Sequence, residues 1–157
     1  MNTNNMTQFK FVPDLTNSAP RSLRCRLGGY VILPRMLDKC RAFLQGLNGD
    51  YHYNCPLDQE FLRFVGIDAE VLKEELSQGR SDDEMIIWVQ ANAINQRSPW
   101  EVLQWSEYQL GRMPESNSDL FEYFTTTLAS LSQTRGDVHT WADLLDLDDY
   151  RSFVGAD

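Results

Sequence analysis

The sequence has few cysteines and histidines and no long apolar run. Its three cysteines, Cys25, Cys40 and Cys55, are too few and too scattered for a disulfide scaffold. Together with two histidines they form no C-x-x-C, H-E-x-x-H or other metal-ligand spacing, so we expect no metal and no cofactor. No segment approaches the roughly 18 apolar residues of a membrane span, and residues 1–15 lack the apolar core of a signal peptide. We therefore expect a soluble protein of a reducing cytoplasm, with no membrane partner.

Basic residues are also scarce. The chain holds 14 Lys/Arg against 23 Asp/Glu and has a net charge of −9, so we expect no nucleic-acid partner. The charge is unevenly distributed, because residues 1–41 contain seven Lys/Arg and two acids, whereas the remaining residues contain seven and 21. Such asymmetry indicates either an interaction site or two parts of one fold that attract each other.

Apolar residues recur at helical spacing along most of the 157 residues, and helix-start signals precede the apolar stripes. These signals are Pro34, Pro56, Asp68, the S-x-x-E boxes at Ser81 and Ser98, and Thr140. Two short segments, Tyr30–Leu33 and Tyr51–Tyr53, are typical of strands. We predict a mainly α protein: a single compact helical domain of six or seven helices over residues 14–157, with a small two-stranded β element. Residues 1–13 are expected to form a disordered or loosely docked tail.

The segment CRLGGYVILPRMLDKCRAFL, residues 25–44, combines two glycines with basic side chains. It matches neither phosphate-binding fingerprint, since its glycines precede the predicted strand instead of following it. Arg24 and Arg26 are two residues apart on an extended chain, and Arg35 and Lys39 are four apart on a helix. These four cations could converge on a carboxylate or phosphate. Alternatively, Asp38 and acids from the later helices neutralise them.

The segment YHYNCPLD, residues 51–58, places Cys55 at a helix N-terminus, where the helix dipole favours a thiolate. His52 is three residues away and could act as its base. The alternative is a small structural side chain beside a helix start.

Aromatic residues of the later helices, Trp100, Trp105 and Tyr108, fit either a core or a partner surface. The acid-rich stretch DLLDLDDY, residues 143–150, suits docking on a basic partner or on the chain's own Arg-rich segment.

The motifs R-L-G-G-Y-x-x-L-P-R-M-x-D-K and Y-H-Y-x-C-P-L-D resemble a family of small bacterial proteins known as a domain of unknown function. The likeness runs from about Asp14 to Trp105. It implies a cytosolic bacterial protein and supplies no activity, so it identifies no catalytic residue.

We interpret the chain as a non-enzymatic binding or regulatory protein that holds a small anionic ligand or an acidic partner segment. The groove would lie between residues 24–41 and residues 51–58, and the candidate ligand-binding residues are Arg24, Arg26, Arg35, Lys39, Tyr51, His52 and Cys55. One alternative is a cysteine-dependent enzyme that uses Cys55 with His52. Another is a structural homo-oligomer whose interface is the aromatic helical surface.

Overall fold

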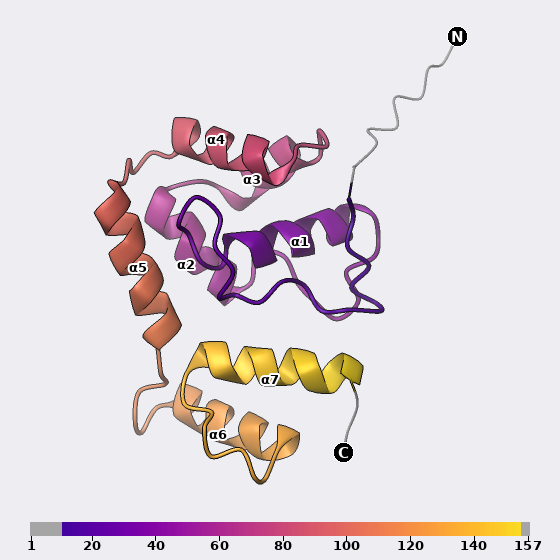
Figure 1. The fold of residues 1–157 in the computed structure, drawn as a ribbon, viewed down its shortest axis with the longest axis vertical. Helices are drawn as coiled ribbons and strands as arrows, with labels where there is room; N and C mark the ends of the chain where they lie inside the picture. The colour runs from indigo at the N-terminus through magenta and orange to yellow at the C-terminus, as the bar shows by residue number, and fades with distance from the viewer. Residues whose placement is uncertain (1–10, 155–157) are drawn as a thin grey trace.

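The computed structural model describes residues 11–154, in which seven helices follow one another along the chain. They are α1 (Leu33–Leu44), α2 (Pro56–Val65), α3 (Ala69–Leu76), α4 (Asp82–Asn92), α5 (Pro99–Gly111), α6 (Asp119–Leu131) and α7 (Trp141–Val154). Figure 1 shows α6 and α7 side by side at one end of the molecule, with α7 between α6 and the helices that precede α5. The expected helical fold is confirmed.

The helix starts follow the predicted capping residues. The Asp68 carboxylate accepts the N–H groups of Glu70 and Val71 at the start of α3. Ser81 and Ser98 begin α4 and α5, each in a reciprocal capping box. Thr140 Oγ1 accepts the N–H of Asp143 at 3.1 Å and so caps α7. Side-chain caps satisfy N–H groups that have no partner within a helix, which explains why these residues fix the boundaries.

The core lies around α1, whose residues from Leu33 to Ala42 are all buried. Met36 and Leu37 of α1 pack in one large apolar cluster with side chains of α2 to α5. A second, smaller cluster joins α6 and α7 and consists of Phe124, Val138, Leu144 and Leu147. The C-terminal helix pair therefore has an apolar core of its own.

The predicted two-stranded β element is wrong. In the described range the chain has a single isolated antiparallel bridge, between Leu27 and Tyr30. Ile32 takes a φ of 75°, which turns the chain directly into α1 and ends any strand there. Near Tyr51 the backbone forms a turn, in which the Tyr51 N–H donates to the Asn48 carbonyl at 2.9 Å. The His52 carbonyl accepts a hydrogen bond from the Lys39 side chain. Both segments are loops, and the first is also held by the Ile32 N–H on the Leu23 carbonyl at 2.9 Å.

Most of the predicted tail, residues 1–13, falls outside the described residues. Within the described part, none of the helices combines the length and apolar character that crossing a bilayer requires.

Candidate functional site

A cavity of about 950 Å³ lies between the α1–α2 region and the C-terminal helix pair. From α7, the residues Trp141, Leu145, Asp148 and Ser152 face it, at spacings of four, three and four that place them on one side of the helix. Apolar side chains form much of its wall: Leu15, Pro56, Leu57, Leu120, Leu145, Trp141 and Phe153. The polar lining includes Arg35, Lys39, Tyr51, His52 and Cys55. The structure thus brings five of the seven candidate binding residues to one cavity.

Arg35 lies under α7 and binds it through Asp149. Its two terminal nitrogens lie 2.6 and 3.1 Å from the two Asp149 carboxylate oxygens, and Nη1 also donates to the Arg21 carbonyl at 3.3 Å. Burial disfavours the charged guanidinium, but the hydrogen bonds and charge of Asp149 outweigh burial and raise the pKa of Arg35. These contacts use three of the five N–H groups of the guanidinium.

Tyr51 completes the same contact. Its hydroxyl donates to Asp149 Oδ1 at 2.8 Å, and its ring lies 5.5 Å below the Arg35 guanidinium. Burial, followed by this hydrogen bond, raises the pKa of Tyr51, so its hydroxyl stays protonated and acts as a donor.

Lys39 has no N–H group left for a ligand. Its Nζ lies 2.9 and 3.0 Å from the two Asp58 oxygens, 3.0 Å from the His52 carbonyl and 3.2 Å from Cys55 Sγ. An ammonium has three N–H groups, and these three partners use them. Lys39 therefore fixes the loop before α2 and the Cys55 side chain instead of offering a free charge to the cavity.

Cys55 is the first residue before α2, as predicted, and its sulfur faces Lys39. The His52 side chain is exposed and makes no hydrogen bond within residues 11–154. The expected Cys55–His52 arrangement is thus replaced in the structure by a Lys39–Cys55 contact.

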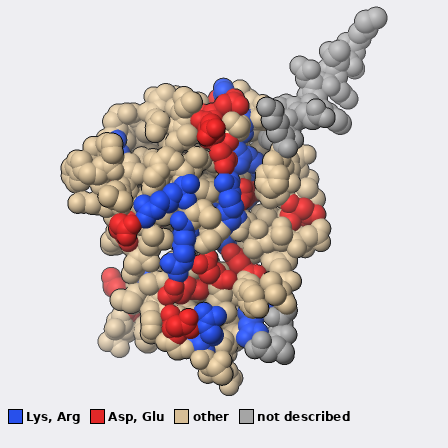
Figure 2. Space-filling model, in the orientation of Figure 1, with Lys and Arg blue, Asp and Glu red and all other residues tan. Residues whose placement is uncertain are grey.

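Arg24 and Arg26 lie away from the cavity. Arg24 pairs with Asp143 and with Asp146, the latter at 2.8 Å, and Arg26 pairs with Glu107 at 2.6 Å. Figure 2 shows basic side chains running down to a band of acidic side chains on this face. The predicted convergence of four cations on one open hollow is therefore wrong, because acids of α5 and α7 bind the two earlier arginines elsewhere.

Arg21 and Arg41, two further basic residues of the described chain up to residue 41, are also paired with acids. Arg21 pairs with Asp38 at 2.9 Å and with Asp82 at 2.8 Å, and Arg41 pairs with Asp82 at 2.7 Å. Each described basic side chain between residues 21 and 41 is therefore paired with an acid of the same chain.

A family model described as Domain of unknown function (DUF5069) matches residues 17–151. The chain belongs to the DUF5069 family. No curated protein matches the sequence. The match extends well beyond the stretch that carries the sequence motifs, and it includes α6 and most of α7. The match thus covers most of the cavity wall, and the lining residues outside it are Leu15, Thr16, Ser152 and Phe153.

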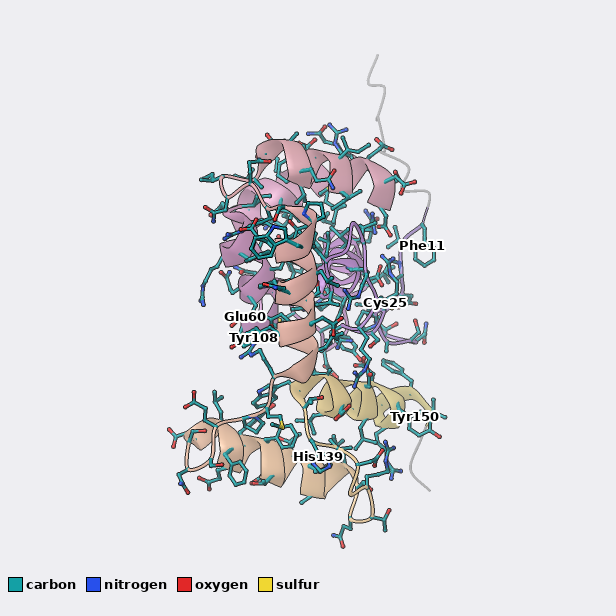
Figure 3. All side chains as sticks on the ribbon, turned by 60° about the vertical axis from the view of Figure 1, so that its left-hand side comes forward. Phe11, Cys25, Glu60, Tyr108, His139 and Tyr150 are labelled. Carbon is teal, nitrogen blue, oxygen red and sulfur yellow. The ribbon has the colours of Figure 1, made fainter. Side chains whose placement is uncertain are left out.

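Several residues that line the cavity of this DUF5069 chain are not among the predicted binding residues. Arg112, at the end of α5, binds Gln109 Oε1 at 3.2 Å and lies 3.5 Å from Glu60 Oε1, which leaves most of its N–H groups available. Figure 3 shows Glu60 beside the last turns of α5. Burial and the neighbouring Asp149 charge raise the pKa of Asp148. Arg112 and Asp148 are distant in sequence from the motifs, so only the packing of α5 and α7 shows that they line the same cavity.

Proposed function

We propose that the chain is a binding protein for a small molecule with an apolar body and one anionic group. The cavity carries the proposal, since about 950 Å³ lies at the upper end of the range of small-molecule sites, roughly 300–1,000 Å³. Such sites combine apolar walls with a few polar groups that orient the ligand. This cavity has that composition.

The apolar body would lie against the α7 side of the cavity. Trp141, Leu145 and Phe153 line it there, and Leu57 and Leu120 line it from α2 and α6. Aromatic side chains supply a large contact area with well-defined geometry, which favours a flat or ring-containing ligand.

The anionic group would bind Arg35 or Arg112, the two guanidiniums that line the cavity. A guanidinium can bind both oxygens of a carboxylate or sulfonate. Asp50, Glu60 and Asp148 also line the cavity, so a ligand with several phosphates would meet unfavourable charges. A single negative charge is therefore the better match.

The alternative occupant named by the sequence, an acidic partner segment, has a competitor within the chain. Asp146 and Asp149 of α7 already bind Arg24 and Arg35. A partner segment would have to displace α7, whereas a small molecule need not.

Thermal shift measurements with aromatic carboxylates and sulfonates test the proposal, because a ligand that binds only the folded state raises Tm. We expect the shift to vanish in Ser152→Trp, which fills the cavity, and to weaken in Arg112→Gln. Gln104→Trp and Arg26→Gln are the matched controls outside the cavity and should keep it. No shift with any compound, or equal shifts in all four variants, would contradict the proposal.

A cysteine-dependent reaction is the second candidate, because Lys39 Nζ donates to Cys55 Sγ at 3.2 Å on the cavity wall. A cysteine sulfur on a cavity wall can act as a nucleophile towards a molecule bound there. In the reducing cytoplasm that we propose for this chain, the thiol would stay free. Rapid alkylation of Cys55 near neutral pH, slowed in Lys39→Met, would support this candidate, and slow labelling of the native protein would remove it.

A further inference from the structure

The two ends of α7 are attached to the rest of the molecule by different kinds of contact. At its start, the Trp141 N–H donates to the Arg112 carbonyl at 3.0 Å, and Ala142 is fully buried in the main apolar cluster. Beyond Leu145, no α7 residue of the described range belongs to that cluster. In the second half of α7, Asp146 binds Ser22 and Arg24 of the segment before α1, whereas Asp149 and Phe153 contact Arg35 of α1 and Tyr51 of the loop that follows it.

The contacts of this second half with α1 and the loops on either side of α1 are mostly polar. Asp146 binds Ser22 Oγ at 2.6 Å and Arg24 Nε at 2.8 Å. Asp149 binds Arg35 and Tyr51, and the Phe153 ring stacks on the Tyr51 ring with centroids 6.4 Å apart. Polar interfaces within a chain permit relative motion more readily than apolar ones.

The opposite face of α7 packs on α6. Leu144 and Leu147 join Phe124 in the second apolar cluster, so α6 and α7 are held together independently of the main core. The face with Leu145, Asp148 and Ser152 lines the cavity. If the second half of α7 moves outward, α6 moves with it and the cavity opens.

We propose that α6 and α7 form a lid over the cavity, which pivots at Trp141–Ala142. The lid is held shut by Asp149 and Phe153 against Arg35 and Tyr51, and by Asp146 against Ser22 and Arg24. The inference rests on the proposed binding function in one respect, because the lid would control the access of the ligand to the cavity. Its motion is a property of the fold and is measured without a ligand.

Amide hydrogen exchange tests whether this part of the fold is held more loosely than α1, as a lid attached mainly by polar contacts should be. We expect residues 146–154 and the amides of α6 to exchange faster than those of α1 in the native protein. Asp149→Asn should speed exchange in these two segments by about fivefold or more and leave α1 unchanged, because it removes a charge-assisted pair. Asp148 forms no ion pair within residues 11–154, so Asp148→Asn, the same change one residue earlier, is the matched control.

Phe153→Ala releases the lid without leaving the Arg35 charge unpaired, so it serves if Asp149→Asn does not fold. Equal exchange in α1, α6 and α7, or no acceleration in either variant, would overturn the lid.

Stopped-flow binding of 8-anilinonaphthalene-1-sulfonate, an apolar dye with one anionic group, tests whether the lid controls access. We expect the observed rate to level off with dye concentration at the opening rate, and Asp149→Asn to raise that plateau. A rate that rises linearly and equally in both proteins would overturn control of access. Dye binding that is unchanged in Ser152→Trp would contradict the proposed function, and the exchange data would still decide the lid.

Discussion

Lys39 and Asp58 form a buried ion pair in which both Asp58 oxygens lie within 3.0 Å of the Lys39 Nζ and the side chains are 4% and 0% exposed. The pair joins α1 to the start of α2 beneath the cavity. A buried charge without its partner is costly, so the pair has strong consequences for stability.

Lys39→Met should lower the free energy of unfolding by about 3–5 kcal/mol, because it leaves the Asp58 carboxylate buried and unpaired. Lys39→Met/Asp58→Leu should be less destabilised than the sum of its single changes. Urea unfolding measures both. Lys73→Met, which breaks the exposed pair with Glu70, is the control and should cost less than about 1 kcal/mol. A similar small loss for Lys39→Met would refute the role of the pair.

The ion pairs of Asp82 should make a contribution to stability that is lost in acid. Burial alone would raise its pKa, but hydrogen bonds from Arg21 and Arg41 outweigh burial and lower it below the ordinary 3.8. The resulting stabilisation is present above the ordinary pKa and is lost as pH falls through the lowered value. Asp82→Asn should therefore reduce stability near neutral pH, and its difference from the native protein should shrink on acidification below about pH 4.

Chemical unfolding at a series of pH values checks this prediction. Asp83→Asn is the control, since Asp83 is the exposed neighbour and forms no ion pair within residues 11–154. A difference for Asp82→Asn that stays constant down to strong acid would count against it.

The three cysteines should differ sharply in reactivity. Cys25 is exposed and should react first. Cys40 is buried, and burial raises the pKa of its thiol to about 12, so it should react only on unfolding. Cys55 should react in the native protein and be shielded by a molecule in the cavity. Iodoacetamide labelling followed by peptide mass spectrometry checks the order, and early labelling of Cys40 would be inconsistent with the core.

A comparison of two glycines with positive φ, Gly46 and Gly49, distinguishes the cost of backbone strain from the cost of a steric clash. Gly46 has φ +70° and open space where a Cβ would lie, whereas at Gly49, with φ +53°, a Cβ would lie 2.6 Å from the Leu15 carbonyl oxygen. Gly46→Ala should cost about 1–2 kcal/mol through its left-handed backbone alone. Gly49→Ala should cost clearly more, since backbone atoms must also move. Thermal and urea unfolding compare them, and equal losses would show that the Leu15 contact is unimportant.

Most of the helical fold could be predicted from the sequence, because helix starts depend on local chemistry. Asp68, Ser81 and Ser98 satisfy the first N–H groups of the helices that follow them. Whether the residues around Tyr30 form a strand could not be predicted from the neighbouring sequence. Apolar residues there suit a buried strand equally well, and the turn at Ile32 depends on the packing of α1.

The candidate site was predicted only in part, for a related reason. Arg35 and Lys39 lie on one side of a helix, and their common position follows from its period. The partners that bind them, Asp149 and Asp58, are 114 and 19 residues away, and helix spacing carries no information about such contacts. Arg112 was missed because nothing near it in the sequence marks a site.

The most direct test of a ligand site in this cavity is nuclear magnetic resonance mapping of 8-anilinonaphthalene-1-sulfonate on the isotope-labelled chain. We predict saturable shifts confined to the cavity wall, at Arg35, Cys55, Arg112, Leu145 and Ser152, and their loss in Ser152→Trp. Saturable shifts centred instead on the exposed aromatic side chains of α5 and α6, with the cavity amides unmoved, would contradict a binding site between α7 and the α1–α2 region.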